Sequence, residues 1–204
     1  MASGRLYVLS GPSGAGKTAL VNELKTREPE VHFAITATTR SPRPGEQHGV
    51  DYFFYREAEF EELLDRDAFV EHARVPPGSG FFYGTPRTEV TDPVERGQDA
   101  FVQVDVQGAR SIRAQLPDAV LIFLKPPDVE TLRSRLIGRA TETTPDIERR
   151  LENAIAELAC EPDFAHVVVN ADRQLAEAVD QVQAIMRRER DRAMASDVAG
   201  DAAG

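Results

Sequence analysis

The sequence predicts an α/β fold in which a mostly parallel sheet is flanked by helices and carries a small inserted α+β lobe. Three observations support this prediction. A strand pattern near the N-terminus leads through a glycine-rich loop into a helix pattern. After residue 97, apolar runs of strand length alternate with helical patterns, which is typical of parallel sheets covered on both faces. Between residues 37 and 96, prolines and glycines interrupt that alternation.

The first predicted strand is the apolar run 5–10, and the glycine loop and a helix at 19–27 follow it. Later apolar and β-branched runs predict three more strands, and helical patterns separate and follow them. These strands are expected at 100–105, 119–124 and 166–170, and the helices at 106–115, 129–137, 147–160 and 174–190. We expect residues 1–36 and 97–190 to form one core.

Residues 37–96 are expected to form the inserted lobe, with an aromatic strand at 52–55 and a helix at 57–65. Residues 138–146 are polar and helix-breaking and have arginines on both sides. The segment 191–204 is polar, rich in alanine and glycine and without periodicity, which predicts a disordered tail.

Composition excludes several classes of protein. A net charge of −10 argues against generic binding to nucleic acid or to anionic membranes. The apolar stretch before the glycine loop, residues 6–9, is far shorter than a signal-peptide core or a spanning helix, so we predict a cytoplasmic protein. The single cysteine, Cys160, cannot form an intrachain disulfide, and no Cys/His cluster has the spacing of a zinc site. The oligomeric state stays open.

The glycine loop matches the phosphate-binding pattern G-x-x-x-x-G-K-[ST]. It comprises Gly11, Pro12, Ser13, Gly14, Ala15, Gly16, Lys17 and Thr18. Glycines in this pattern let backbone N–H groups turn toward phosphates, and the N-terminus of the following helix adds positive potential. We expect Lys17 to bridge the β- and γ-phosphates of ATP and the Thr18 hydroxyl to bind the accompanying Mg²⁺.

This loop alone does not distinguish a kinase from an ATPase or a GTPase. The segment Asp105-Val-Gln-Gly108 even imitates the D-x-x-G motif of GTPase switches. A GTPase also needs a guanine-reading N-K-x-D motif, and none of the asparagines is followed by lysine. The sequence therefore disfavours a GTPase.

Motifs in the predicted lobe narrow the choice further. They are Thr36-Ala-Thr-Thr-Arg40-Ser-Pro-Arg43-Pro-Gly-Glu, Gly49-Val-Asp-Tyr52-Phe-Phe, Glu71 and Phe82-Tyr83-Gly84-Thr85-Pro86. Together with the phosphate loop and Asp105-Val-Gln-Gly108, they closely resemble guanylate kinase, and the resemblance covers residues 5–186. It implies a P-loop nucleoside monophosphate kinase of purine metabolism that transfers the γ-phosphate of ATP to GMP, and to dGMP, and releases ADP.

The resemblance also implies which residues bind GMP. The residues that would hold its phosphate are Arg40, Arg43, Tyr52 and Tyr83. Those that would read or flank the guanine are Thr36, Glu71, Thr85 and Asp105. Arginine forks bind phosphate oxygens bidentately, which agrees with the first group. A carboxylate such as that of Glu71 can accept both N–H donors of guanine's Watson–Crick edge. Adenine lacks that donor pair, and sites of this kind reject such analogues by about 10⁴ to 10⁵.

Five arginines lie within residues 133–150, a pattern that usually marks a solvated helix face. Here the resemblance implies a short lid at about residues 138–146, with Arg135, Arg139 and Arg150 as lid and sensor residues. These three complete a predicted catalytic set with Lys17, Arg40 and Arg43. No general base is required, because a phosphate monoester is mostly dianionic at pH 7. Thr18 and Asp105 are the expected Mg²⁺ ligands.

Three departures from the family pattern stand out. Gln103 occupies a position that is usually acidic, which places more of the metal binding on Asp105 and Thr18. Pro76-Pro77-Gly78 adds about three residues beside the guanine pocket, and Ala140 replaces a common glycine in the lid.

Two rival functions fit the sequence less well. A related small-molecule kinase, such as a ribose-bisphosphate kinase, does not account for the lobe motifs. A non-catalytic guanylate-kinase-like module that binds proteins would have lost the phosphate loop, whereas Lys17 and Thr18 are intact.

Overall fold

The computed structural model describes residues 4–75, 80–137 and 144–201. A five-stranded sheet with the order β2-β7-β1-β8-β9 forms the core, and all of its strand pairs are parallel. Its strands are β1 (Leu6–Ser10), β2 (His32–Phe33), β7 (Ala100–Gln103), β8 (Val120–Lys125) and β9 (His166–Val169). The predicted α/β class with a mostly parallel sheet is confirmed.

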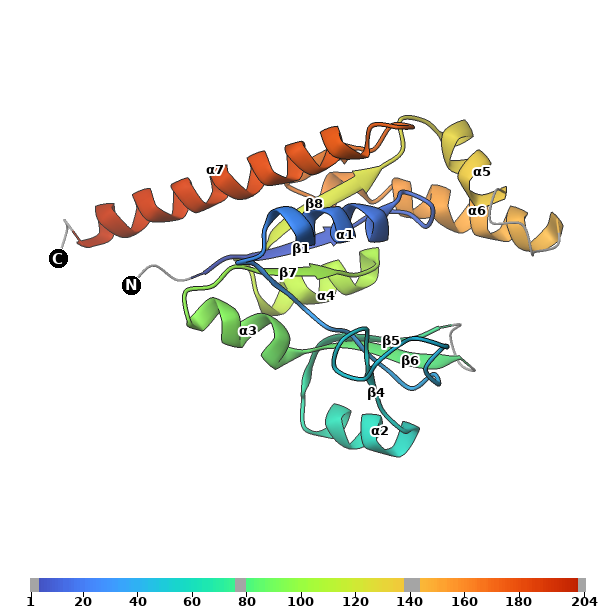
Figure 1. The fold of residues 1–204 in the computed structure, drawn as a ribbon, viewed down its shortest axis with the longest axis horizontal. Coiled ribbons are helices and arrows are strands. Elements are labelled where there is room, and N and C mark those ends of the chain that lie inside the picture. The colour runs from blue at the N-terminus through green and yellow to red at the C-terminus, as the bar shows by residue number, and fades with distance from the viewer. Residues whose placement is uncertain (1–3, 76–79, 138–143, 202–204) are drawn as a thin grey trace.

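The central strand β1 is buried along its whole length because helices cover both faces of the sheet. Tyr7 and Leu9 point into a cluster with α1 (Lys17–Arg27) and α7 (Leu175–Asp201). The alternate residues, Leu6 and Val8, pack with α3 (Arg87–Glu95) and α4 (Val106–Gln115). This alternation follows from the two-residue repeat of a strand, and Figure 1 shows the two helical layers.

Two further helices stand at the end of the sheet that carries the phosphate loop (Figure 1). They are α5 (Val129–Ile137) and α6 (Thr144–Leu158), and a 3₁₀ turn at Glu161–Asp163 leads from α6 toward β9. Leu132 and Leu136 of α5 pack against Ala154 of α6 in a small separate core. The two helices therefore behave as one packed hairpin.

The lobe contains a second, four-stranded sheet with the order β4-β3-β6-β5. Its elements are β3 (Ala37–Thr38), β4 (Phe53–Phe54), α2 (Glu57–Asp65), β5 (Phe69–Val75) and β6 (Phe81–Pro86). Phe60 of α2 stacks on Phe69 and Phe82, with ring centroids 4.4 and 5.1 Å apart. These aromatic contacts attach the lobe helix to its sheet. The expected strand at 52–55 is shorter than predicted, because only two of its residues pair.

The structure differs from the sequence prediction at three boundaries. Helix α3 lies within the predicted lobe range 37–96, yet Val90 packs with the core strands. Helix α7 continues to Asp201 as one 27-residue helix, so the prediction of a disordered tail from residue 191 is wrong as far as Asp201. Residues 138–143 of the predicted lid lie outside the described residues, and residues 144–146 form the start of α6.

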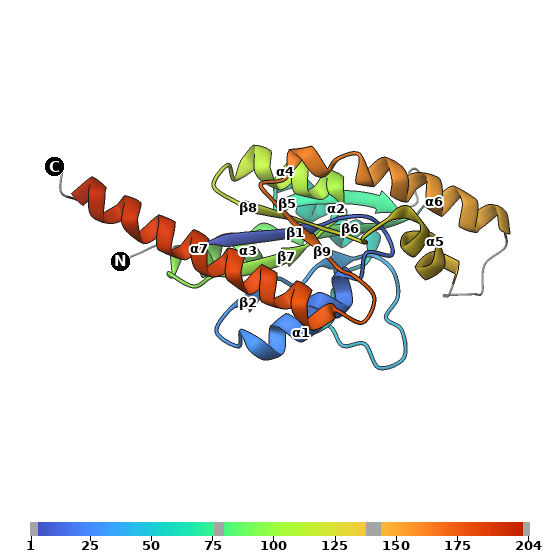
Figure 2. The same ribbon diagram turned by 90° about the horizontal axis from the view of Figure 1, so that it is seen from above.

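Seen from above, α7 crosses the sheet and projects past the first strand (Figure 2). Its last turns include alanines, arginines and a methionine, which are good helix formers. Among the residues described, no helix combines the length and the apolarity needed to cross a membrane.

Candidate functional site

The phosphate loop connects β1 to α1 at the carboxyl end of the sheet. Gly11 and Gly16 adopt φ angles of +139° and +94°, which side chains disfavour. A Cβ atom at Gly11 would lie 2.0 Å from the Leu124 carbonyl oxygen, and one at Gly16 would lie 2.4 Å from the Asn170 amide nitrogen. The backbone of β8 and the side chain of Asn170 thus leave no room for a Cβ atom, which explains why glycine is required at both positions.

Side chains from the end of β9 and from α5 hold the outer side of the loop. The buried Asn170 donates from Nδ2 to the Ala15 carbonyl at 2.8 Å. Arg135 donates to the same carbonyl at 3.4 Å and to the Asn170 carbonyl at 2.8 Å, and it pairs with Asp172 at 2.7 Å. Arg135, predicted to close over the phosphates, therefore braces the loop in this structure.

Lys17 folds back over its own loop. Its Nζ donates to the carbonyls of Gly11 at 2.5 Å and of Pro12 at 3.1 Å. Helix α1 begins at Lys17 and has no acidic residue in its first turn. The first N–H groups of a helix have no partner within the helix, and its dipole is positive at this end. The loop therefore offers an anion site beside a lysine.

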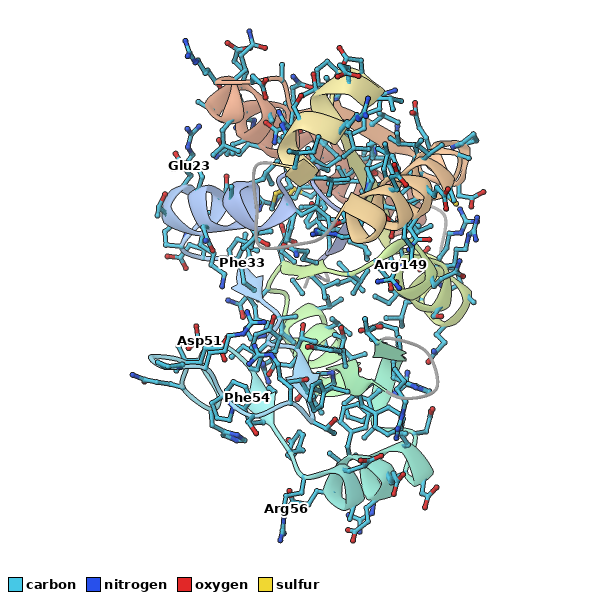
Figure 3. All side chains as sticks on the ribbon, turned by 90° about the vertical axis from the view of Figure 1, so that its right-hand side faces the viewer. Glu23, Phe33, Asp51, Phe54, Arg56 and Arg149 are labelled. Atoms are coloured by element: carbon cyan, nitrogen blue, oxygen red, sulfur yellow. The ribbon has the colours of Figure 1, made fainter. Side chains whose placement is uncertain are left out.

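A cavity of about 370 Å³ opens between the core and the lobe, next to this loop. It brings together seven residues that the sequence predicted for the site: Lys17, Thr18, Thr36, Tyr52, Glu71, Tyr83 and Asp105. Figure 3 shows the two sides, with Phe33 on the core and Asp51 on the lobe; both also line the cavity. One cavity thus joins the end of the phosphate loop, Lys17 and Thr18, to most of the predicted GMP site.

Glu71, on β5, lies deepest among the acidic residues of the cavity. Thr85, its cross-strand neighbour on β6, donates a hydrogen bond to Glu71 Oε1 at 2.6 Å. A Cβ at Gly108 would lie 3.0 Å from Glu71 Oε2, so α4 approaches the carboxylate closely because this residue is glycine. Burial, assisted by the negative charge of Asp105, raises the pKa of Glu71 to about 7, against the opposing bond from Thr85.

Arg40 is buried but does not line the cavity. Its guanidinium makes two hydrogen bonds to Glu46, at 2.6 and 2.7 Å, and one to the Ser41 carbonyl at 2.9 Å. It lies 4.9 Å from the centre of the Tyr52 ring, and Tyr52 does line the cavity. The bonds from Arg40 and then from the Arg43 N–H lower the pKa of Glu46 to about 2. Arg43 itself is exposed.

The other predicted site residues have mixed outcomes. Arg150 Nη2 lies 3.3 Å from the Ser13 hydroxyl, at the phosphate loop. Arg139, Ala140 and the Pro76-Pro77-Gly78 segment lie outside the described residues. Gln103 lines the cavity between core and lobe, so the unusual residue does face the site.

The predicted metal ligands fit Mg²⁺ chemically. Thr18 and Asp105 both line the cavity and offer a hydroxyl and a carboxylate. Asp105 Oδ1 caps α4 by accepting from the Gly108 N–H at 2.7 Å. Within the described ranges, no group of three or more His, Cys, Asp or Glu residues could hold a metal. Mg²⁺ is usually bound by one or two protein oxygens together with substrate phosphates and water, so this sparse set suits it.

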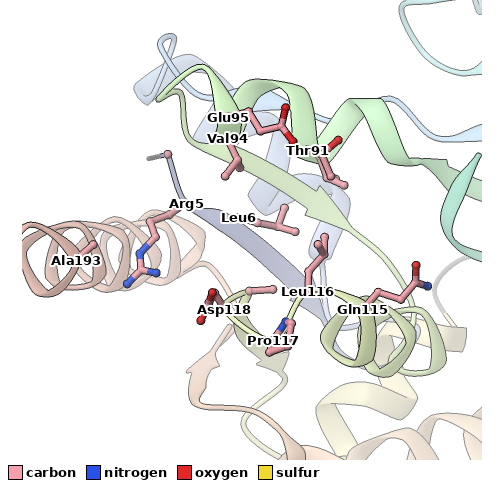
Figure 4. A pocket seen from close by; sticks show the side chains of 13 residues that line it. Arg5, Leu6, Thr91, Val94, Glu95, Gln115, Leu116, Pro117, Asp118 and Ala193 are labelled. Carbon is pink, nitrogen blue, oxygen red and sulfur yellow. The ribbon is translucent and has the colours of Figure 1, made fainter. Parts of the chain in front are cut away.

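A second cavity, of about 350 Å³, lies at the opposite end of the sheet (Figure 4). Its lining includes Leu6, Val94, Leu116 and Ala193, and it is mainly apolar. Ligands of open α/β sheets bind outside the carboxyl ends of the strands. Because this cavity lies at the amino end of β1, we place the functional site at the first cavity.

Sequence reasoning missed three residues that shape the site. Glu46 orients Arg40, Asn170 holds Ala15, and Glu157 of α6 accepts from the Ser13 N–H at 3.0 Å. Glu46 stands within a quoted motif, so its spacing from Arg40 could have been noticed. No local pattern marks Asn170 or Glu157, because their partners lie more than 140 residues away.

Comparison with known proteins agrees with this geometry. The sequence profile of guanylate kinase matches residues 3–189. A guanylate kinase of Streptomyces coelicolor is 48% identical over 166 residues, covering 81% of this chain and 83% of the relative. One of a Synechococcus species is 43% identical over 183 residues, covering 90% and 82%. The crystal structure of guanylate kinase from Anaplasma phagocytophilum superposes with a TM-score of 0.73 at 31% identity, over 93% of this chain and 88% of that one. The chain belongs to the guanylate kinase family.

Proposed function

We propose that this guanylate kinase binds GMP in the cavity between core and lobe and phosphorylates it with ATP held at the phosphate loop. The observation that carries this proposal is the composition of that cavity. Its lining contains Lys17 and Thr18 of the phosphate loop together with Glu71, Tyr52 and Tyr83 of the lobe. Donor and acceptor phosphates bound to these two groups would meet in one space.

Glu71 would select guanine. Its carboxylate accepts hydrogen bonds from guanine N1–H and N2–H, while Thr85 fixes one of its oxygens. The ionised form is the better acceptor, and two N–H donors from the base favour ionisation on binding. Thr36 and Asp105 complete the wall around the base. The same contacts serve dGMP, because they involve the base and not the sugar.

Arg40 would hold the GMP phosphate from a fixed position. An arginine has five N–H donors, and the three bonds to Glu46 and Ser41 use three of them. We expect the remaining donors, which lie next to Tyr83, to bind a phosphate beside Tyr52 and Tyr83, whose hydroxyls would also donate. Arg43, which is exposed, would complete the phosphate site by turning inward.

The reaction is an in-line transfer. A phosphate oxygen of GMP, already deprotonated at neutral pH, forms a bond to the γ-phosphorus of ATP. The bond from that phosphorus to the β,γ-bridging oxygen breaks, and its electron pair leaves with ADP. Lys17 moves from the carbonyls of its own loop to the β- and γ-phosphates. Arg150 of α6 and Arg139 of the predicted lid would add positive charge. Thr18 and Asp105 would hold Mg²⁺, which would supply charge neutralisation when bound.

The proposed setting is the cytoplasm, where free nucleotides are the substrates. A net charge of −10 opposes binding to nucleic acid or to anionic membranes, so local cations must attract ATP and GMP.

The test is an ADP-release assay with ATP and Mg²⁺, in which GMP, dGMP, AMP, CMP and ribose bisphosphate are offered separately. We expect turnover with GMP and dGMP only, and loss of turnover in Lys17→Ala. Turnover with AMP or with the sugar bisphosphate and not with GMP would contradict the proposed acceptor. Tight GMP binding without ADP release would identify a binding module.

A further inference from the structure

Helix α6 contacts the phosphate loop at one residue through two of its side chains. Glu157 Oε2 accepts a hydrogen bond from the Ser13 backbone N–H at 3.0 Å. Arg150, two turns earlier on the same helix, lies 3.3 Å from the Ser13 hydroxyl. Residues seven apart share one face of a helix, so this face of α6 is turned toward the loop.

The hairpin of α5 and α6 also packs directly against the next residue of the loop. A Cβ atom at Gly14 would lie 3.1 Å from Leu132 and 3.2 Å from Leu136, both of α5. The same two leucines pack on Ala154, which is fully buried on α6 between Arg150 and Glu157. The middle of the phosphate loop is thus held by the hairpin that flanks residues 138–143.

The carboxylate of Glu157 is unfavourable next to a triphosphate site unless it has a specific partner. Like charges repel, and ATP brings several negative charges to this loop. A hydrogen bond from a backbone N–H to a carboxylate is charge-assisted and stronger than one to a neutral oxygen. The Glu157 carboxylate is therefore stabilised by its hydrogen bond to the loop backbone, whereas contact with the nucleotide would be repulsive.

From this geometry we propose that Glu157 is a positioning residue, which fixes the phosphate loop for ATP by accepting a hydrogen bond from the Ser13 N–H and couples the loop's conformation to helix α6. This inference rests on the proposed binding of ATP at the phosphate loop. It assigns Glu157 no contact with either substrate. Removing the acceptor should loosen the loop around Ser13 and weaken ATP binding, while the GMP site on the lobe stays intact.

The test compares Glu157→Ala, Glu157→Gln and Glu157→Asp with Glu152→Ala, an exposed residue of the same helix. We expect Glu157→Ala to raise KM for ATP about tenfold, because the half-buried Ser13 N–H loses its charged acceptor. KM for GMP should change by less than about twofold. Gln keeps an acceptor of the same length and should restore most of the ATP affinity, whereas Asp is one methylene too short and should not.

A second measurement excludes a general loss of structure. Hydrogen exchange at the Ser13 amide should speed up in Glu157→Ala, while the melting temperature and the exchange of amides in β1 stay close to those of the parent. Equal changes in KM for ATP and GMP, unchanged kinetics in Glu157→Ala, or failure of Gln to rescue would each overturn the proposal. If the parent releases no ADP with any acceptor, the proposed function has failed, which is distinguishable from failure of Glu157 alone.

Discussion

Replacing Glu71 by glutamine should stabilise the free protein and impair its reaction, and the two effects have one cause. Glu71 has a pKa of about 7 in the folded protein, against 4.5 for an ordinary glutamate, chiefly because it is buried. Each pKa unit corresponds to about 1.4 kcal/mol, so ionised Glu71 costs the fold roughly 3 kcal/mol. Glutamine keeps the side-chain shape and an oxygen for Thr85, but it carries no charge.

The sign of the pH dependence follows from the two pKa values. Below about pH 4.5 the carboxyl is protonated in both states, and its titration adds no difference between them. Between 4.5 and 7 the unfolded chain releases the proton while the folded protein retains it. The free energy of unfolding therefore falls as pH rises through this window, by roughly 3 kcal/mol in total at pH 8. The Glu71→Gln variant has no carboxyl at this position, so its free energy of unfolding does not fall for this reason.

The assay is urea unfolding of the parent and of Glu71→Gln at pH 5 and pH 8, followed by circular dichroism. Other titrating groups are shared by both proteins and cancel in the difference. We expect the advantage of Glu71→Gln to grow by about 2 to 3 kcal/mol between the two pH values. If the difference in free energy of unfolding between the two proteins did not change with pH, the claim that the buried, ionised Glu71 destabilises the fold would be refuted.

The kinetic half of the prediction uses the same pair of proteins. The amide of glutamine places a donor opposite guanine's N–H donors, so kcat/KM for GMP should fall at least about tenfold. In the parent, KM for GMP should decrease as pH rises through 7, because Glu71 becomes ionised. In Glu71→Gln only the GMP phosphate, with a pKa near 6, should still contribute to that dependence.

Three other substitutions test single contacts. Lys17→Ala should lower ADP release at least about a hundredfold, because a donor to the transferring phosphate is lost, while circular dichroism shows an unchanged fold. Glu46→Ala should raise KM for GMP about tenfold with KM for ATP unchanged, since Arg40 loses its bidentate partner; equal shifts in both constants would contradict this. Asn170→Ala leaves the Ala15 carbonyl without its amide donor and should lower the free energy of unfolding by about 1 to 3 kcal/mol, measured by urea denaturation.

Local sequence determined the parts of the structure that could be predicted. Four of the five core strands and most of the helices lie within a few residues of their predicted positions, because burial on both faces produces continuous apolar runs. The phosphate loop was identified from its glycines, and Gly11, Gly14 and Gly16 all have positive φ angles. In each case the residues that specify the structure are adjacent in the chain.

Contacts between distant segments determined the parts that could not be predicted. The strands β2 and β3 have two residues each and exist only through pairing with β7 and with β4 and β6. Helix α3 contains Pro93, a residue that disfavours helix interiors, and its position follows from the packing of Val90. Glu157 and Asn170 form no motif with their sequence neighbours, although both hold the phosphate loop.

Acidic residues of this protein fix the conformation of arginines near the two proposed nucleotide sites. Arg40 is held by Glu46, and Arg135 is held by Asp172 and by the backbone of the loop. These partners keep long side chains in one conformation before a nucleotide arrives, so less side-chain entropy is lost on binding. The acidic residues thus position the arginines at the cost of some of their positive potential. Attraction over distance is weaker as a result, and recognition depends on the closely placed donors of the phosphate loop and the lobe.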